Sequence, residues 1–455
     1  MRMGRSTILV AVVSTLAIAM SGCAFITQSS VASDGTPGNF DARLMFGARD
    51  VISDDGRYVV FESQSDNLVP NDTNTSVDVF RHDNVTGATV RVSVDDSGAQ
   101  VDVGGRDAAM SADGRYVVFA TMASLVAADT NGLSDVYRRD MSNGDVALVS
   151  VDENGDPNVD TNAIGRLPSI SADGQTIAWI SPTSGGHVHV RRMSVVGSTA
   201  LAGAVSLDHP TVSRDGNHVY WNPYCGLKCP NPPIAVSDLA NPYPFSPPDG
   251  RISDVSSDGR YVTETVSAFD QIFDRQTGNA QATDTTGLLG QSSSDGRFRL
   301  SVGRQNQVLT LIDELTGISR RVNQPGEFQN PPPTSEYPFA MTPDGRYVTF
   351  AREQTVVFTT DAAFPVPVGL ETGVLPRGAD HVSVRIDGGF FLPNATVDGG
   401  AGITIHSTQF NANGSLTVVM SVAADAAVGD HTIKVRNPGV VGDSSGWCIN
   451  CLAVT

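Results

Sequence analysis

The most regular feature of the chain is a short unit of polar and apolar positions that recurs from residue 52 onward. Its first copy is residues 52–61, Ile-Ser-Asp-Asp-Gly-Arg-Tyr-Val-Val-Phe, and its second is residues 110–119, Met-Ser-Ala-Asp-Gly-Arg-Tyr-Val-Val-Phe. An Asp-Gly pair before such an apolar run predicts a β-hairpin, because glycine supplies the positive φ that a tight turn needs. The glycines of the seven copies are Gly56, Gly114, Gly174, Gly216, Gly259, Gly296 and Gly345.

A second turn signal follows the first in most copies. It is an apolar pair, an aspartate and then a glycine turn, as in residues 79–87, 272–278 and 311–317. Two hairpin turns imply about four strands per copy, the content of one propeller blade. Successive glycines are 58, 60, 42, 43, 37 and 49 residues apart, and the first two intervals therefore carry loop insertions, since blades usually span about 40 to 50 residues. We expect an all-β chain with a β-propeller of seven blades, or six if one copy is degenerate, closed by an N-terminal strand within residues 39–46.

The repeated unit resembles the WD40-like repeats of the TolB-like family of periplasmic propellers. In that family Ser-x-Asp-Gly-Arg followed by an apolar run marks each blade, and the resemblance covers roughly residues 40–363. It implies the propeller fold. It implies little about function, because propellers serve as binding proteins, scaffolds and hydrolases alike.

The pattern changes after residue 361, where Phe-Pro-Val-Pro at residues 364–367 is typical of a linker. Short strand-like runs then alternate with Gly and Asn turns, and about seven such runs in about ninety residues predict a small β-sandwich. Residues 388–397 and 426–438 resemble stretches of Ig-like domains of the IPT/TIG kind. That resemblance implies a spacer or an adhesion unit.

The N-terminus has the order of a secretory signal: Arg2 and Arg5, an apolar run over residues 8–20, and then Ser-Gly-Cys at residues 21–23. This end resembles a bacterial lipobox, which implies lipidation of Cys23 and attachment to the outer face of the cell membrane. An ordinary secretory signal with an unrelated cysteine is the alternative. The expected organisation is a signal peptide (1–22), a flexible tether (23–38), a TolB-like propeller (39–363) and an Ig-like sandwich (364–455).

The negative net charge argues against binding to nucleic acids or to anionic membrane surfaces. The formal charge is −19, and removal of residues 1–22 takes away two arginines and no acid, leaving −21. No run of Arg and Lys offers the basic stripe that a nucleic acid requires, and a polybasic membrane patch is disfavoured for the same reason.

Apart from Cys23, the cysteines form two close pairs, and we expect the disulfides Cys225–Cys229 and Cys448–Cys451. A zinc site built from both pairs is the alternative.

Two loops predict weak calcium sites. Asp72, Asn74 and Asp78 in the first repeat, and Asp129, Asn131 and Asp135 in the second, offer oxygen ligands at positions 1, 3 and 7 of a calcium-type loop. Neither loop has the bidentate Glu at position 12, so an Asx-turn that only shapes the loop is the competing interpretation.

No other sequence pattern predicts a catalytic or metal-binding site. Residues 442–446 match Gly-x-Ser-x-Gly, but no histidine follows Ser444 and no strand-to-helix turn is expected there. His187 and His189 share a strand face and could in principle share a metal, but a solvated strand face is the simpler interpretation.

We therefore expect a non-enzymatic envelope lipoprotein that binds a protein or a glycan. The alternative is a propeller enzyme, a glycan lyase or hydrolase, with carboxylates from several blades gathered at the axial mouth.

Overall fold

A computed structural model describes residues 26–44, 50–157, 166–181, 187–201, 210–221, 235–238, 251–255, 261–266, 269–274, 277, 279–282, 287–303, 308–323, 339–352, 356–439, 441 and 444–455. Every regular element among these residues is a β-strand. None of them belongs to a helix long and apolar enough to span a membrane.

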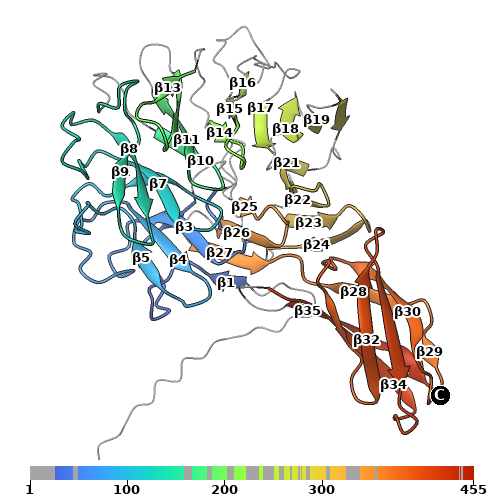
Figure 1. The fold of residues 1–455 in the computed structure, drawn as a ribbon. Helices are drawn as coiled ribbons and strands as arrows, with labels where there is room; N and C mark the ends of the chain where they lie inside the picture. The colour runs from blue at the N-terminus through green and yellow to red at the C-terminus, as the bar shows by residue number, and fades with distance from the viewer. Residues whose placement is uncertain are drawn as a thin grey trace, which may run out of the picture.

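Seven antiparallel sheets, counted over the described residues up to Asp361, follow one another around a common axis (Figure 1). The predicted all-β propeller of seven blades is thus confirmed. The blades comprise β2 (Ala42–Arg43), β3 (Tyr58–Ser63), β4 (Asp78–Asp83) and β5 (Thr89–Arg91); β6 (Arg106–Met110), β7 (Tyr116–Thr121), β8 (Asp135–Asp140) and β9 (Val146–Leu148); β10 (Arg166–Ile170), β11 (Thr176–Ser181), β12 (His187–Arg192) and β13 (Thr199–Ala200); β14 (Thr211–Val212), β15 (His218–Trp221) and β16 (Ala235–Asp238); β17 (Arg251–Val255), β18 (Tyr261–Val266), β19 (Phe269–Asp274) and β20 (Asn279–Ala282); β21 (Gly287–Ser292), β22 (Phe298–Gly303), β23 (Leu309–Asp313) and β24 (Ile318–Arg321); and β25 (Phe339–Met341), β26 (Tyr347–Arg352) and β27 (Val356–Asp361) with β1 (Ile26–Gln28).

The ring is closed by β1, which pairs antiparallel with β27 and supplies the fourth strand of the seventh blade. This corrects two expectations. The closing strand does not lie within residues 39–46, since β2 in that stretch is the first strand of the first blade and pairs with β3. Residues 26–38 are also not a free tether, because Ser29 donates its backbone N–H to Val357 O at 2.8 Å and Val31 forms a bridge with Pro37.

Hydrogen bonds join Ser53, Asp55 and Arg57 of the repeated unit in the first turn. Asp55 Oδ1 accepts hydrogen bonds from Ser53 Oγ at 2.7 Å and from the Arg57 N–H at 3.0 Å. Gly56 has a φ of +73°, which is accessible to glycine and costly for other residues. The same hydroxyl-to-aspartate bond recurs in the turns at residues 111–113, 171–173, 213–215, 293–295 and 342–344. The Asp258-Gly259 turn lies outside the described residues.

In four of the units the aromatic residue packs on the glycine of the next blade, whereas in the third unit Thr176 takes its place against Gly216. A Cβ atom on Gly114 would lie 2.3 Å from the Tyr58 ring, and one on Gly56 would lie 2.4 Å from Tyr347 of the seventh blade. Nothing larger than glycine therefore fits between the turn and the neighbouring ring. The contact between Tyr347 and Gly56 joins the last blade to the first in the same way. This packing explains why glycine and an aromatic residue recur together in the unit.

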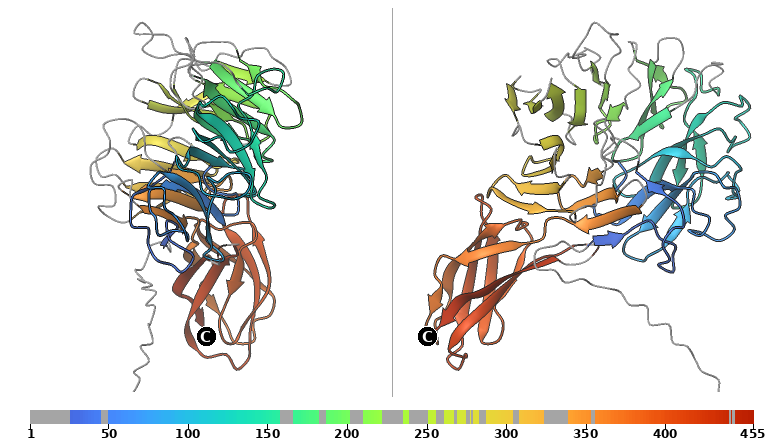
Figure 2. Two further views of the ribbon diagram at one scale, coloured as in Figure 1. Left: turned by 90° about the vertical axis from the view of Figure 1, so that its left-hand side faces the viewer. Right: turned by 180° about the vertical axis from the view of Figure 1, so that it is seen from behind.

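The remaining chain forms a sandwich of two four-stranded sheets, which the views place beside the sixth and seventh blades (Figures 1 and 2). Its core contains Val384, Phe391, Val418 and Ile433 with their neighbours. The first sheet is β28 (Val366–Leu370), β30 (Val382–Gly389), β33 (Leu416–Val422) and β32 (Ile403–Phe410), and the second is β29 (Val374–Leu375), β35 (Ser444–Val454), β34 (Gly429–Asn437) and β31 (Thr396–Asp398).

Sandwich and propeller share a buried junction. Phe390 stacks on Phe298 of the sixth blade, with ring centroids 5.9 Å apart and planes within 7°. Buried Asn437 donates from Nδ2 to Ala363 O and to Phe390 O, both at 2.7 Å, and accepts the Leu392 N–H at 3.1 Å. These contacts fix the sandwich to the propeller at the point where the chain passes from one to the other.

Candidate functional site

An arginine side chain, Arg91, pairs with the aspartates of the first predicted calcium loop. Asp72 Oδ2 lies 3.0 Å from Arg91 Nη2, and Asp78 Oδ2 lies 3.7 Å from Arg91 Nε. Asn74 Nδ2 donates to Asp78 Oδ2 at 3.1 Å and to Val101 O at 2.7 Å. All three charged side chains are buried, and Arg91 supplies the positive charge that calcium would bring.

The second loop has no such arginine. Asp135 and Leu148 are separated by the same number of residues as Asp78 and Arg91, so leucine occupies the corresponding position. Asp135 Oδ1 accepts the Ser150 hydroxyl at 2.6 Å, but the buried Oδ2 accepts no hydrogen bond. Burial raises the pKa of Asp135 to about 6, a shift that the nearby charge of Asp129 increases and the Asn131 side chain reduces. Of the two loops, this is the one with uncompensated buried carboxylate charge.

Asp129 and Asn131 keep the Asx-turn geometry of the competing interpretation. The Asn131 N–H donates to Asp129 Oδ1 at 3.3 Å, and the Leu133 N–H donates to Asn131 Oδ1 at 2.8 Å. Tyr137 donates its hydroxyl hydrogen to Asp129 Oδ2. Turn formation and calcium ligation are compatible here, since Oδ2 of Asp135 remains available.

The other predicted residues are only partly placed. Cys448 and Cys451 are joined as a disulfide within β35, with Cα atoms 5.6 Å apart. Cys23, Cys225 and Cys229 lie outside the described residues, so their roles stay predictions. Ser444 is buried at the start of β35, so a substrate cannot reach its hydroxyl.

Acidic residues from two blades gather near the propeller axis. Glu62 at the end of β3 accepts the Asp107 N–H at 2.7 Å, and Asp107 lies in a bulge of β6 with a φ of +57°. Asp50 of the first blade accepts the hydroxyl of Ser169 in the third blade at 3.3 Å. Burial, and then the charge of Asp107, raise the pKa of Glu62 to about 7. Glu62 is therefore poised to exchange a proton near neutral pH, as a general acid or base must.

The axis is bridged on the side of the Asp-Gly turns. Arg214 of the fourth blade forms an ion pair with Asp54 of the first blade. Blades one and four are not neighbours in a ring of seven, so this pair lies across the axis. The two side chains therefore span the axial opening on this side.

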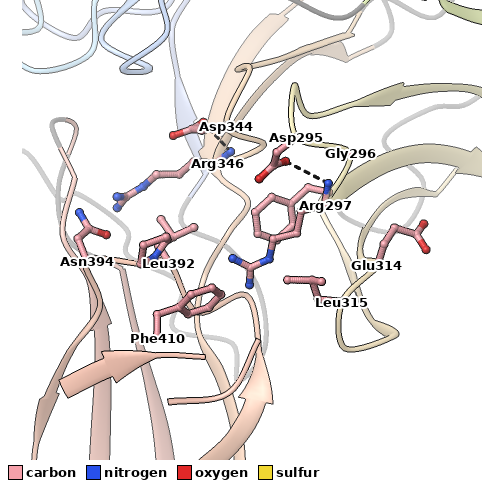
Figure 3. A pocket seen from close by; sticks show the side chains of 12 residues that line it. Asp295, Gly296, Arg297, Glu314, Leu315, Asp344, Arg346, Leu392, Asn394 and Phe410 are labelled. Atoms are coloured by element: carbon pink, nitrogen blue, oxygen red, sulfur yellow. Dashed lines mark hydrogen bonds between the residues drawn. The ribbon is translucent and has the colours of Figure 1, made fainter. Parts of the chain in front are cut away.

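A cavity of about 560 Å³ lies off the axis, between the turns of the sixth and seventh blades and the sandwich (Figure 3). Its volume falls in the range of about 300 to 1,000 Å³ that is usual for small-ligand sites. We call it the junction pocket. It is lined by Asp295, Gly296, Arg297, Phe298, Glu314, Leu315, Asp344, Arg346, Leu392, Pro393, Asn394 and Phe410.

The cations of the junction pocket are already paired. Arg297 Nη2 lies 3.0 Å from buried Asp313 Oδ2, and its guanidinium lies 4.9 Å from the centre of the Phe410 ring. Arg346 Nη2 lies 2.9 Å from Asp361 Oδ2. The arginines are therefore part of the junction, and an anionic ligand would have to compete with buried carboxylates for them.

The remaining polar side chains of the pocket are the carboxylates of Asp295, Asp344 and Glu314 and the amide of Asn394. Asp295 and Asp344 each use one oxygen in their own turn, where it accepts the N–H of the following arginine at 3.0 Å (Figure 3). Glu314 pairs with Arg299 at 2.6 Å and is half exposed. Leu315 and the Phe410 ring form the apolar part of the pocket wall, and the carboxylate oxygens form a part that accepts hydrogen bonds. A ligand with hydroxyl or ammonium groups on an otherwise apolar face fits this chemistry.

Comparison with solved structures bears on the fold. The chain aligns with an oligogalacturonate lyase in complex with manganese at a TM-score of 0.53 and 12% identity, over 75% of this chain and 94% of the other. This chain contains a β-propeller. An oligogalacturonate lyase from Vibrio parahaemolyticus aligns at a TM-score of 0.48 with 11% identity, covering 75% and 98% of the two chains, and TolB from Acinetobacter baumannii at 0.38 with 13% identity, covering 63% and 64%. Such identities show the fold alone. No protein-family model and no curated protein matches the sequence.

Proposed function

We propose that the protein is a lipoprotein of the cell envelope that binds a glycan or an envelope protein without catalysis, and that the junction pocket is its binding site. The observation that carries this proposal is the combination, in one preformed cavity, of an aromatic ring, apolar side chains and carboxylate oxygens, with both arginines already in ion pairs. The sequence of residues 1–23 supports the envelope location and the lipid anchor.

A glycan fits this pocket best. Sugar rings present C–H groups on one face and hydroxyl groups at the edge, so the face can pack on Phe410 while the hydroxyls donate to Asp295, Asp344 or Glu314. Aromatic side chains with a few convergent polar groups are the usual composition of such sites.

The test is a binding titration of the mature protein with soluble peptidoglycan fragments and neutral cell-wall oligosaccharides. Phe410→Ala removes the ring and is expected to weaken binding at least about tenfold, in keeping with about 1.4 kcal/mol for a contact of this size. Phe40→Ala is the matched control, because Phe40 is an exposed phenylalanine of the propeller away from the pocket. Equal affinity of the Phe410→Ala variant and wild type would refute the pocket assignment.

The enzyme alternative has one observation in its favour, which is the raised pKa of Glu62 beside Asp107. A glycan lyase or hydrolase acting at the axis would use Glu62 as the acid or base. Among the described residues, however, these acids do not form a group that could share a metal ion. Turnover of acidic or neutral polysaccharides that is lost in Glu62→Gln would favour this alternative over simple binding.

A further inference from the structure

Two histidines and an aspartate meet on the exposed face of the first sandwich sheet. Asp380 and His381 come directly before β30, and His406 lies on β32. Their potential ligand atoms all lie within 4.8 Å of one another, and no other group of three or more acidic, His or Cys side chains in the described chain is so close. None of these residues belongs to the junction pocket or to the calcium loops.

Two irregularities of the backbone bring these side chains together. His406 is the extra residue of a bulge in β32, since Ile405 pairs with Met420 and Ser407 with Val419. His381 has a φ of +50°, which is unfavourable for a residue with a side chain. Bulges re-aim side chains, and both bulges and strained backbone are enriched at functional sites. Both irregularities fall on the two histidines.

The resulting arrangement is tight for exposed side chains. The imidazole rings of His381 and His406 stack with centroids 4.1 Å apart and planes within 12°. Ser421 lies between the groups: its hydroxyl donates to Asp380 Oδ1 at 2.7 Å and contacts His406 Nε2 at the same distance. Asp380 Oδ1 also lies 2.8 Å from His381 Nδ1. The side chains of Asp380 and His381 are 74% and 63% exposed, so a dissolved ion can reach them.

We propose that Asp380, His381 and His406 form a binding site for Zn²⁺ or a similar first-row divalent cation. Two imidazole nitrogens and one carboxylate oxygen are a preferred donor set for zinc, whereas calcium takes six to eight oxygens. Bonds of about 2.0 to 2.2 Å place tetrahedral ligands about 3.4 Å apart. The three groups therefore need only small side-chain rotations, in which the ion replaces their contacts with each other and with Ser421.

A site with three protein ligands leaves the fourth tetrahedral position open. Because the site is on the surface, that position is accessible to water or to a donor atom of a partner molecule. The inference is independent of the proposed function, since it needs neither the pocket nor the lipid anchor.

The experiment is a titration of the metal-free, untagged mature protein with Zn²⁺ by calorimetry and with Co²⁺ by visible absorption, after alkylation of free thiols. One cation per chain is expected, with the d–d bands of Co²⁺ bound to nitrogen and oxygen. His381→Ala and His406→Ala should each weaken binding by more than the tenfold to hundredfold loss that is typical of a residue outside the ligand shell.

His431→Ala is the matched control, because His431 is a partly exposed histidine of the same sandwich that lies outside the cluster and contacts only Ala427 O in the described contacts. It should bind the cation like wild type. Folding of each variant is checked by circular dichroism. Absence of Zn²⁺ binding to the wild type, or equal binding by wild type and both cluster variants, would overturn the proposal.

Discussion

Replacement of Asn437 by alanine is expected to loosen the sandwich from the propeller. Asn437 is fully buried, and its amide joins three backbone groups of the junction, namely Ala363 O, Phe390 O and the Leu392 N–H. Alanine would remove all three hydrogen bonds and would also leave a small cavity. Water cannot easily replace the amide, because Phe390 and Leu392 belong to the same buried apolar cluster as Phe298.

The expected cost follows from these contacts. The loss of three hydrogen bonds at about 1 kcal/mol net each gives about 3 kcal/mol, and each buried group left without a partner adds to this, so we expect a loss of at least about 3 kcal/mol. This is a large part of the roughly 5 to 15 kcal/mol that stabilises a domain. Asn413→Ala is the control, because Asn413 is exposed and its side chain binds only Ser415 in an adjacent turn. The control is expected to lose about 1 kcal/mol or less.

Three measurements separate loosening from general unfolding. Calorimetry reports the unfolding temperature, limited proteolysis reports exposure of the connection between β27 and β28, and small-angle scattering reports whether the molecule becomes more extended. Asn437→Ala should unfold at lower temperature, be cut faster at this connection and scatter as a longer particle, while its propeller stays folded. A variant as stable, as resistant to protease and as compact as Asn413→Ala would refute the role given to Asn437.

Four further predictions follow from the described contacts. Millimolar Ca²⁺ should raise the unfolding temperature of the wild type but not of Asp135→Asn, whereas Asp72→Ala should keep the response, since Arg91 already neutralises the first loop. Stability should fall as pH rises from about 4.5 to 7, because the folded protein holds a proton on Glu62 that the unfolded chain releases, and denaturation of Glu62→Gln should lack this part of the fall. Mass spectrometry of unreduced peptides should find both Cys225–Cys229 and Cys448–Cys451, and free thiols at either pair would contradict that pairing. Cys23→Ser should move the protein from the membrane fraction into the soluble fraction, and continued membrane attachment would exclude the anchor.

The blades could be predicted from sequence because each residue of the unit acts over a short range. Ser53 and Asp55 bond within one turn, and Gly56 and Tyr58 each meet an aromatic ring or a glycine of an adjacent blade. Such contacts recur wherever the unit recurs, so the pattern itself carries the information. The closing strand has no such signal. Residues 26–28 are Ile-Thr-Gln, three residues without periodicity, and they become a strand only because the edge of β27 lies beside them in the fold.

The candidate sites show the same difference between local and distant signals. The two Asp-x-Asn loops look alike in sequence, but the charge that distinguishes them is Arg91, which lies on β5, beyond the loop. Comparison of the two repeats position by position, Arg91 against Leu148, would have revealed it. The contact between His381 and His406 depends on a β-bulge at His406 and on a positive φ at His381. Neither feature can be predicted from the residue types. The junction pocket combines two blades with the sandwich, so no single stretch of sequence encodes it.

The position of the closing strand also constrains how a lipid anchor would hold the molecule. Cys23 precedes Ile26 by three residues, which span at most about 11 Å at 3.3 to 3.6 Å per residue. The expected sixteen-residue tether, residues 23–38, would reach about five times as far. If Cys23 carries the lipid, as proposed, the edge of the seventh blade is held next to the membrane surface. The same blade contributes Asp344 and Arg346 to the junction pocket. The protein would then meet its ligand close to the bilayer, which favours a ligand of the envelope itself over one carried in from solution.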